Sequence, residues 1–461
     1  MTERPIIPKV SILMPSLNVA SYIRQSIESV VSQSLKDIEI ICIDAGSTDG
    51  TLDIIEEYAS ADSRLTVIYS DRRSYGYQMN LGIEAAKGEY IGIVETDDYV
   101  DTNMYESLYT LASDTDSDMA KGTHSLVYED EKGNICSLTG DYIPGYIREG
   151  QAFDPGNSPD VHSWERYIWN GIYRRSFLEE KNIRFNESEG AAFQDISFQQ
   201  IILNDAKHIT YIRKPYYNYR VVRPGASTWN GESIRYLYNE YKRIFDYKEL
   251  KTERLGAIRS RMLWAFICEY EKELLRADYN RSEMRFSDET KWFLDQLERI
   301  YEESLFSRYL LTESYENRAR RLIYDEENFM DAGKKGRKLL LDWLDGLHNI
   351  KGERPLILYG CGNYGNACML FLIRNRMIPA GVVDQNEQRQ GERFYGYEIL
   401  SLETAVKEYP EAVYVTASKD SMDMNAELEK NGVGGNRIYT MSILGIYAAM
   451  SLIPYPLPEI V

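Results

Sequence analysis

Short runs of apolar and β-branched residues alternate with helical patterns through the first hundred residues, and this alternation constrains the fold more than any other feature. The expected strands are Val10 to Met14, Ile38 to Ile43, Leu65 to Tyr69 and Tyr90 to Val94, and Ser21 is expected to cap the first helix. Such alternation builds βαβ units around a mainly parallel sheet. The sequence therefore predicts an α/β fold for this region.

After this region the sequence pattern changes twice. The first change is to a helical pattern rich in charged residues. A new α/β pattern then begins with an expected strand at Leu356 to Tyr359 and continues to another at Gly381 to Val383. A chain of 461 residues is long enough for two or three domains. The predicted division is an α/β domain at 1–231, a helical linker domain at 232–349, a small Rossmann-like domain at 350–445 and a tail at 446–461.

Charge and cysteine content restrict the class of protein. The net charge is -19, and most of the acidic surplus lies in residues 1–231. This disfavours partners such as nucleic acid, which bind basic surfaces, and suits a site that holds a divalent cation. The five cysteines form no CxxC pair, which argues against a disulfide framework and a zinc ribbon. We expect a protein of the reducing cytoplasm, and a homo-oligomer stays open.

Membrane segments are not indicated. Met1 to Lys9 lacks the apolar core of a signal peptide, and no run of about 18 apolar residues occurs. The apolar tail from Ile443 to Pro454 fits a terminal helix packed on a domain, with a membrane-surface anchor as the alternative. The expected location is cytoplasmic, with contact at the inner face of the membrane left open.

An acidic cluster follows the last of the four expected strands. Glu95, Asp97, Asp98 and Asp101 lie within seven residues, and a second acidic turn begins at Asp44 after another strand. Ligands of open α/β sheets bind beyond the carboxyl ends of the strands. Carboxylates there suit Mg²⁺ or Mn²⁺, which commonly takes one or two of them together with substrate phosphates. The alternative is a solvated acidic turn.

Three segments in order resemble one known family. They are Val10-Ser-Ile-Leu-Met-Pro-Ser-Leu-Asn18, Ile38-Glu-Ile-Ile-Cys-Ile-Asp-Ala-Gly-Ser-Thr-Asp-Gly50 and Gly88-Glu-Tyr-Ile-Gly-Ile-Val-Glu-Thr-Asp-Asp98. The stretch from about 8 to 230 resembles the inverting family 2 glycosyltransferases with the A-type nucleotide-sugar fold. The resemblance implies a nucleotide diphosphate donor, with a UDP-sugar expected, and a divalent metal. It also implies a saccharide, lipid-linked glycan or protein acceptor, and a role in polysaccharide biosynthesis.

The resemblance also implies roles for individual residues. Nucleotide-sugar contacts are expected at Pro15, Asp44, Asn80, Glu95 and Asp97, and metal ligation at Asp97 and Asp98. Two positions depart from the family pattern: Ala45 replaces an Asp after Asp44, and Glu95 replaces the Asp that usually begins the acidic motif. One nucleoside contact and the role of Glu95 are therefore open.

An inverting transfer needs a general base that removes the proton of the acceptor hydroxyl. Asp195 is the candidate, because Phe193-Gln194-Asp195 resembles the acidic dipeptide of the family beneath the acceptor site, with Gln194 in place of Glu. Asp at a helix start is also an ordinary cap. Upstream, Trp169 is an acceptor-site candidate or a core residue.

Two arginines, Arg220 and Arg223, end the acidic first region. Arginine forks bind phosphate oxygens well. Either one could clamp the donor diphosphate, and a surface ion pair is the alternative.

A second ligand site is conceivable near the C-terminus. Gly360, Gly362 and Gly365 follow a predicted strand and open a helix, and Asp384 comes about 20 residues further on, as in dinucleotide-binding turns. NAD could bind there, but a fold kept for packing or assembly is the favoured interpretation. The rival functions for the chain are an NAD-linked nucleotide-sugar-modifying enzyme and a non-catalytic glycan-binding scaffold.

Overall fold

The structure is a computed structural model that describes residues 7–129, 135–140, 143–165, 167–221, 232–276, 287–302, 313–418 and 421–441. The chain forms two compact units. The first comprises residues 1–126, 141–265 and 298–311, and the second comprises 127–140, 266–297 and 312–461. The division into three domains at 231 and 349 stays a prediction.

A twisted sheet forms the core of the first unit. Its strands follow the order β3-β2-β1-β4-β8-β6-β9-β5. The pairs β1·β2, β2·β3 and β1·β4 are parallel, whereas β8 is antiparallel to β4 and β6, and β5 to β9. The bounds are β1 Val10–Ser16, β2 Ile38–Asp44, β3 Leu65–Tyr69, β4 Tyr90–Ile93, β5 Tyr99–Val100, β6 Met119–Glu129, β8 Gly171–Arg174 and β9 Ile209–Arg220. The predicted α/β class is confirmed.

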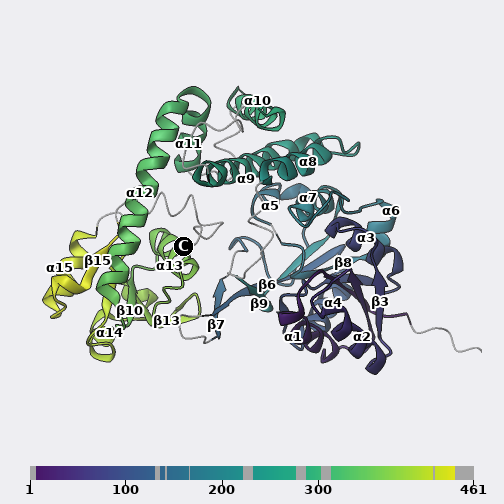
Figure 1. Cartoon of the computed structure of the whole chain (residues 1–461), viewed down its shortest axis with the longest axis horizontal. Coiled ribbons are helices and arrows are strands. Elements are labelled where there is room, and N and C mark those ends of the chain that lie inside the picture. Colours follow the sequence, from purple (N-terminus) through teal and green to yellow (C-terminus); the bar gives the residue numbers. More distant parts are fainter. Residues whose placement is uncertain are drawn as a thin grey trace, which may run out of the picture. The chain divides into compact units, whose positions relative to one another are not determined.

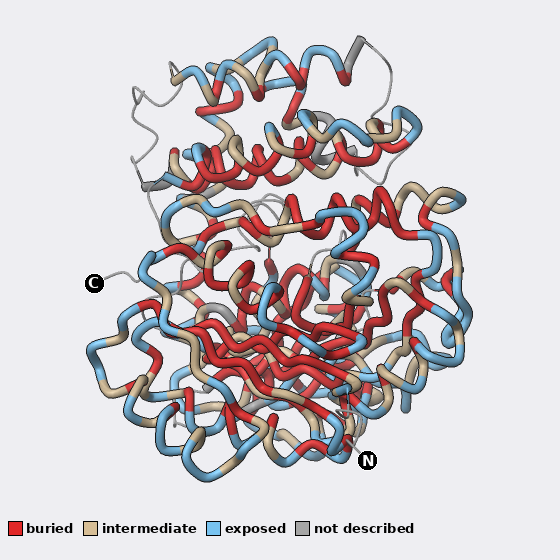
Figure 2. The backbone as a smooth tube through the Cα atoms, turned by 90° about the vertical axis from the view of Figure 1, so that its right-hand side faces the viewer, coloured by how far each residue is buried: buried red, intermediate tan, exposed pale blue. Residues whose placement is uncertain are grey.

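Helices connect and cover these strands (Figure 1). The tube in Figure 2 is buried along the central strands and exposed along the surrounding loops, as expected for parallel strands covered on both faces. The helical segments of this region are α1 Ala20–Val31, α2 Thr51–Ala61, α3 Tyr75–Ala85, α4 Met104–Asp114, η1 Pro155–Asn157, α5 Val161–Trp164, α6 Arg175–Glu180, α7 Gln194–Asp205, α8 Ser233–Phe245 and η3 Thr252–Arg254.

The start of α1 differs from the sequence-based expectation. The helix begins at Ala20, before Ser21, and its first backbone groups are bonded from the next loop. The N–H of Val19 donates to Thr51 Oγ1 at 2.8 Å, and the N–H of Ala20 donates to Asp49 Oδ2 at 3.0 Å. Side chains distant in sequence therefore satisfy the helix start, which makes a local cap at Ser21 unnecessary.

The second unit contains a smaller, mostly parallel sheet of order β12-β13-β11-β10-β14-β15. Its strands are β10 Leu356–Tyr359, β11 Gly381–Val383, β12 Arg393–Phe394, β13 Tyr397–Leu400, β14 Val413–Thr416 and β15 Ile438–Thr440, and β7 Ile135–Gly140 also belongs to this unit. Its helices are α11 Glu313–Tyr324, α12 Glu326–Lys351, α13 Asn363–Arg374, η6 Glu387–Arg389, α14 Leu402–Glu408, α15 Met422–Lys430 and η7 Gly435–Arg437. Helices α9 Leu255–Arg276 and α10 Asp288–Glu302 carry residues of both units.

The helices of the described ranges include none long and apolar enough to cross a membrane. The apolar tail from Ile443 to Pro454 lies outside the described residues.

Candidate active site

The candidate site lies at the carboxyl ends of the parallel strands β1, β2 and β4. Ser16 and Asp44 end β1 and β2 side by side, and Val94 follows β4 with its N–H bonded to Leu13 O at 2.9 Å. Gln78 of α3 joins two of these ends, because its Nε2 donates to Ser16 O at 3.0 Å and to Ile43 O at 2.7 Å. The strand ends are thus held at one edge, where ligands of such sheets bind.

The acidic turn is fixed at this edge by its neighbours. Thr96 Oγ1 donates to Pro15 O at 2.7 Å, and the N–H of Glu95 donates to Tyr217 Oη at 3.0 Å. Pro15 therefore supports the turn through its carbonyl oxygen. Tyr217 comes from β9, which returns to the acidic turn more than a hundred residues later in the chain.

Asp98 is the buried member of the acidic pair. It is 1% exposed, and its carboxylate accepts hydrogen bonds from Tyr217 Oη at 2.9 Å and from the Arg220 N–H at 2.7 Å. Burial and the adjacent Asp97 hold the pKa of the Asp98 carboxyl well above its usual range. Both oxygens of Asp98 thus join the turn to the end of β9.

Arg220 is the cation of this site. Its Nη1 donates to Asp97 O at 2.9 Å, its Nη2 bonds to Gln25 Oε1, and its guanidinium lies over the rings of Tyr22 and Tyr99. Two aromatic faces and two acceptors limit how the side chain can move. Its place beside the acidic turn puts a fixed positive charge next to the carboxylates. Arg223 lies outside the described residues.

Glu95 points to a different neighbour. Tyr75, the first residue of α3, donates its hydroxyl to Glu95 Oε1 at 2.6 Å. Tyr75 is half-buried and also interacts electrostatically with Asp195. The longer side chain of Glu95 is therefore directed toward the α3 and Asp195 side of the site.

Asp44 shapes the second acidic turn. Its Oδ1 accepts the N–H groups of Gly46 at 2.9 Å and Ser47 at 2.8 Å, while its Oδ2 accepts the hydroxyls of Ser16 at 3.1 Å and Ser47 at 2.6 Å. Asn18 joins the loop after β1 to the same turn, because its Oδ1 accepts the Thr48 N–H at 2.9 Å. With four internal hydrogen bonds, Asp44 fixes the loop that would surround a nucleoside.

Asn80 is turned away from the strand ends. Its Nδ2 donates to Phe185 O at 3.1 Å and to Glu187 Oε1 at 3.0 Å, and its Oδ1 accepts the Phe185 N–H at 2.8 Å. The side chain is 6% exposed. Asn80 therefore holds the segment at Phe185 against α3.

Asp195 lies in the first turn of α7 and is half-buried. Burial raises the pKa of its carboxyl to about 6, against the favourable fields of Arg261 and Lys121. Phe193 immediately precedes the helix with φ of 67°, a left-handed conformation that is strained for a bulky residue. Gln194 is buried, and its Nε2 donates to Ser188 Oγ at 3.0 Å and to Gly190 O at 3.2 Å. Gln194 thus holds the preceding loop.

Trp169 lies in a buried aromatic cluster. It is 7% exposed, and its ring stacks on Tyr217 with centroids 4.1 Å apart and on Tyr219 at 5.2 Å. Tyr167 and His124 pack at its other contacts. Because two tyrosines already occupy stacking positions, Trp169 acts as a packing residue that supports Tyr217 beneath the acidic turn.

A divalent metal ion is expected at the acidic turn. The described residues contain no group of three or more His, Cys, Asp or Glu side chains arranged to hold a metal ion. Such a group is unnecessary for Mg²⁺ or Mn²⁺ bound mainly by substrate phosphates and water. Asp97 is more exposed than Asp98 and fits this mode, whereas the oxygens of Asp98 already serve two donors.

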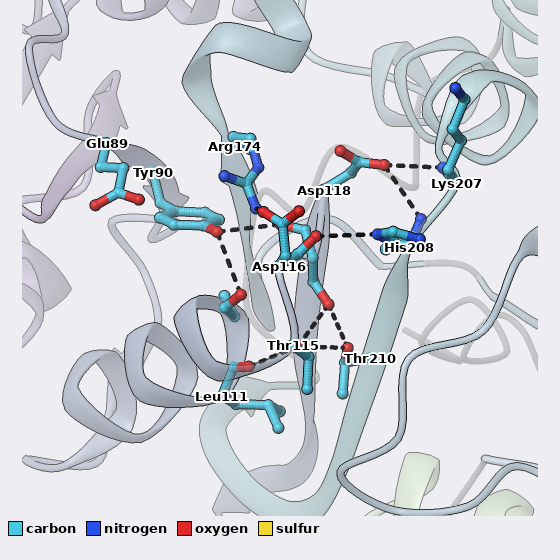
Figure 3. Close-up of polar contacts among 12 residues, drawn as sticks. Glu89, Tyr90, Leu111, Thr115, Asp116, Asp118, Arg174, Lys207, His208 and Thr210 are labelled. Atoms are coloured by element: carbon cyan, nitrogen blue, oxygen red, sulfur yellow. Dashed lines mark hydrogen bonds and ion pairs between the residues drawn. The ribbon is translucent and has the colours of Figure 1, made fainter.

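Charged residues also gather at the opposite end of β4 (Figure 3). Tyr90 begins β4 and pairs with Arg174, whose Nη2 lies 2.6 Å from Asp116 Oδ1. Asp118 Oδ2 accepts the His208 N–H at 3.2 Å. These contacts brace the sheet at the end remote from the acidic turn, and His208 takes no part in the candidate site.

The glycine turn of the second unit follows β10, between the strands β11 and β14 that flank it. Gly360 has φ of 108°, and a Cβ at Gly365 would lie 1.8 Å from Gly360 O. Gly362 caps α13. Asp384 accepts the Cys361 N–H at 2.8 Å and lies 3.6 Å from Arg389 Nη1. The geometry agrees with a tight strand-to-helix turn, and a fold kept for packing or assembly stays the predicted interpretation, with NAD binding as its alternative.

Several residues at the site are not among those that the sequence predicted. Tyr75, Gln78 and Tyr217 hold the acidic turn and the strand ends, and Glu240 of α8 contacts the start of α7. Each comes from an element that only the fold brings to the site. In the sequence of β9, three tyrosines lie close to Arg220, and they indicate aromatic contacts near this arginine.

Comparison with known proteins identifies what the chain resembles. A family model described as "Glycosyl transferase family 2" matches residues 11–180, which include the acidic turn and end before Asp195 and Arg220. The putative glycosyltransferase EpsH of Bacillus subtilis is 32% identical over 221 residues, 46% of this chain and 61% of that one. The glycosyltransferase GlyG of Streptococcus pneumoniae is 30% identical over 217 residues, 46% of this chain and 70% of that one.

One solved structure is similar in fold to a larger part of this chain. Residues 1–349 of TarS from S. aureus superimpose with a TM-score of 0.52 at 18% identity, covering 72% of this chain and 91% of that chain. A second TarS structure, with a TM-score of 0.52, was solved in complex with UDP-GlcNAc. The chain spans less than two thirds of the length of EpsH.

Proposed function

The chain belongs to glycosyl transferase family 2, and we propose that it moves a sugar from a nucleoside-diphosphate donor to a glycan-type acceptor with inversion at the sugar carbon. The observation that carries this proposal is the acidic turn at the carboxyl end of β4, with Arg220 fixed beside Asp97. A UDP-sugar is the first donor to test, because the fold neighbour TarS was crystallised with UDP-GlcNAc.

The donor diphosphate meets Asp97 and Arg220 in this proposal. Asp97 would hold a Mg²⁺ or Mn²⁺ ion, which supplies charge that stabilises the departing diphosphate. Arg220 contributes a fixed positive charge to the same oxygens. Asp98 keeps the turn in place through Tyr217 and the Arg220 N–H. The loops held by Asp44 and Asn18 enclose the nucleoside.

Asp195 acts as the general base. The acceptor hydroxyl oxygen attacks the anomeric carbon and forms the new glycosidic bond, while the bond from that carbon to the diphosphate oxygen breaks. The hydroxyl proton passes to Asp195, and the nucleoside diphosphate leaves with the bonding electrons. Burial raises the pKa of Asp195 to about 6, close enough to neutral pH for an effective base. The acceptor is a saccharide, a lipid-linked glycan or a protein.

A panel of nucleotide sugars tests the function without a known acceptor. The purified chain is incubated with each donor and Mn²⁺, and release of the nucleoside diphosphate is measured over hours. We expect slow hydrolysis of one donor or a few, because water can replace the acceptor. No hydrolysis of any donor, together with no calorimetric binding of UDP, GDP or dTDP, would contradict the proposal.

A further inference from the structure

Glu240 is a buried carboxylate on α8, beyond the segment that the family model matches. It is 1% exposed. Its Oε1 accepts a hydrogen bond from Asn186 Nδ2 at 2.8 Å, and its Oε2 accepts one from the Ser197 N–H at 3.3 Å. Burial of a carboxyl group is costly unless it is hydrogen-bonded, so these two contacts determine where the side chain can lie.

The two contacts fall on either side of one loop. Asn186 stands at the start of the segment that leads to α7, and Ser197 lies in the first turn of α7, two residues after Asp195. Backbone N–H groups at a helix start need partners from outside the helix, and α8 supplies one here. Glu240 therefore joins both ends of the loop that carries Phe193, Gln194 and Asp195.

The loop that carries Asp195 is strained at one end and closely packed at the other. Phe193 adopts φ of 67° directly before α7, a conformation that persists only when its surroundings enforce it. At the other end, the carbonyl of Asn186 packs against Gly76 so closely that a Cβ there would lie 1.8 Å from the oxygen. Glu240 thus stabilises a strained turn whose geometry sets the direction of Asp195.

Electrostatic interactions also connect Glu240 with the groups around Asp195. Glu240 and Asp195 interact electrostatically, and burial raises the pKa of Glu240 to about 7. The other charged or titratable groups around the pair are Lys121 of β6, Tyr75 of α3, Tyr173 of β8, Tyr241 and Arg243 of α8 and Arg261 of α9. The two arginines and the lysine favour the ionised carboxylates, whereas the charge of Asp195 disfavours ionisation of Glu240.

We propose that Glu240 is a positioning residue for the transfer reaction, which holds the first turn of α7 so that Asp195 faces the acceptor hydroxyl. This inference rests on the proposed function and on Asp195 as the base. A helix that follows the family-matched segment thereby completes the site. The residue acts through Asp195 and makes no contact with the donor in this role.

The test compares Glu240→Gln with the exposed control Glu249→Gln, both in the full chain. Glutamine keeps the size but presents an amide N–H₂ to one of the two donors, so one hydrogen bond is lost. We expect kcat for hydrolysis of the donor found in the panel to fall at least tenfold, with KM and calorimetric binding of UDP and Mn²⁺ unchanged. The control should behave as the wild type.

The pH dependence separates positioning from general damage. Because the pKa of Glu240 is about 7, Glu240 is mostly protonated at the pH where Asp195 titrates, so in Glu240→Gln the acidic limb of the kcat profile should stay near pH 6 while kcat is lower across the profile. An unchanged kcat would overturn the inference, and so would a fall in kcat that comes only from a displaced limb. If Glu240→Gln does not fold, Asn186→Ala removes one contact and leaves the carboxylate, and the same shift in kcat is expected, to a smaller extent.

Failure of the inference is distinguishable from failure of the function. If the wild type hydrolyses no donor, or if Asp195→Asn keeps full activity, the proposed function or its base is wrong. If the wild type is active, Asp195→Asn is inactive and both Glu240→Gln and Asn186→Ala match the wild type, only the role of Glu240 is refuted.

Discussion

Asp97 and Asp98 are adjacent in the sequence yet differ in their surroundings. Asp98 is buried, and its two oxygens accept hydrogen bonds from Tyr217 and Arg220. Asp97 is partly exposed, and its carbonyl oxygen accepts the guanidinium of Arg220. We therefore propose that Asp97 contacts the metal and the diphosphate, whereas Asp98 supports the turn.

Replacing Asp97 with Asn should weaken donor binding in the presence of Mn²⁺ by at least tenfold and abolish transfer. The physical reason is the loss of the negative charge that holds the cation between the protein and the diphosphate. Isothermal calorimetry with UDP, with and without Mn²⁺, measures the effect. Asp53→Asn, an exposed substitution on α2, serves as the control, and equal Mn²⁺-dependent affinities in both variants would rule out this role.

Replacing Asp195 with Asn should lower kcat by roughly 10²-fold or more and leave UDP binding unchanged, because only the proton acceptor is lost. In the wild type, the base works when ionised. Since the pKa of Asp195 is raised to about 6, kcat should increase with pH up to about 6 and then level off. A profile that is flat from pH 5 to 8 would point to a different base.

The chemistry of single residues was easier to predict than their contacts. The acidic turn, Arg220 and Asp195 could be named as candidates because their residue types suit diphosphate binding and proton transfer. Asn80 and Gln194 were expected near ligands, but their amides bond to backbone atoms at Phe185 and Gly190. An amide serves either purpose, and only its surroundings decide between them.

At the scale of elements, helix α3 controls how the site is assembled. Its first residue reaches Glu95, its Gln78 joins the ends of β1 and β2, and its Gly76 lies against the backbone of Asn186. Helix α3 begins at Tyr75, directly after the Ser74 cap. Its first two residues contact the segment that leads to Asp195, because the Tyr75 N–H donates to Gly190 O at 2.8 Å and Gly76 lies against Asn186.

Gly76→Ala should destabilise the protein strongly, since the new Cβ would lie 1.8 Å from Asn186 O and the backbone must move. Destabilisation of about 3 kcal/mol or more is expected, comparable with overpacking of a core. Gly82→Ala in the same helix is the matched comparison. Its Cβ meets only the ends of the Leu13 and Ile43 side chains at 3.0 to 3.1 Å. Urea unfolding followed by circular dichroism measures both, and equal midpoints would contradict the predicted difference.

For the whole molecule, buried titratable groups set opposing trends of stability with pH. Burial lowers the pKa of His124 to about 3 and of His162 to about 4, so the stability that these neutral rings contribute is lost as pH falls below about 6.5. Glu240 acts in the other direction. Its pKa is raised from 4.5 to about 7, so the folded state favours the protonated form and loses stability as pH rises between these values.

Glu240→Gln should reduce the loss of stability between pH 5 and pH 8 by at most about 3 kcal/mol, at about 1.4 kcal/mol for each unit of pKa shift. Comparing the variant with the wild type cancels the contribution of the histidines. Urea unfolding at both pH values provides the measurement. An identical change of unfolding free energy in the two proteins would show that Glu240 is ionised without cost in the folded state.

The sequence by itself determined the α/β class, the strands of the parallel sheet and the location of the acidic turn at a strand end. These follow from local periodicity and from residue chemistry over short spans. It also placed the strands at Leu356–Tyr359 and Gly381–Val383 of the second unit.

Only the tertiary structure decided which side chains meet at the site. Tyr217 and Arg220 reach the acidic turn from β9, Tyr75 reaches Glu95 from α3, and Glu240 reaches the start of α7 from α8. Such contacts depend on how strands pair and how helices pack, which residue type and spacing along the chain do not encode. For this reason the acidic turn was predictable, whereas the contacts that distinguish Asp98 from Asp97 were not.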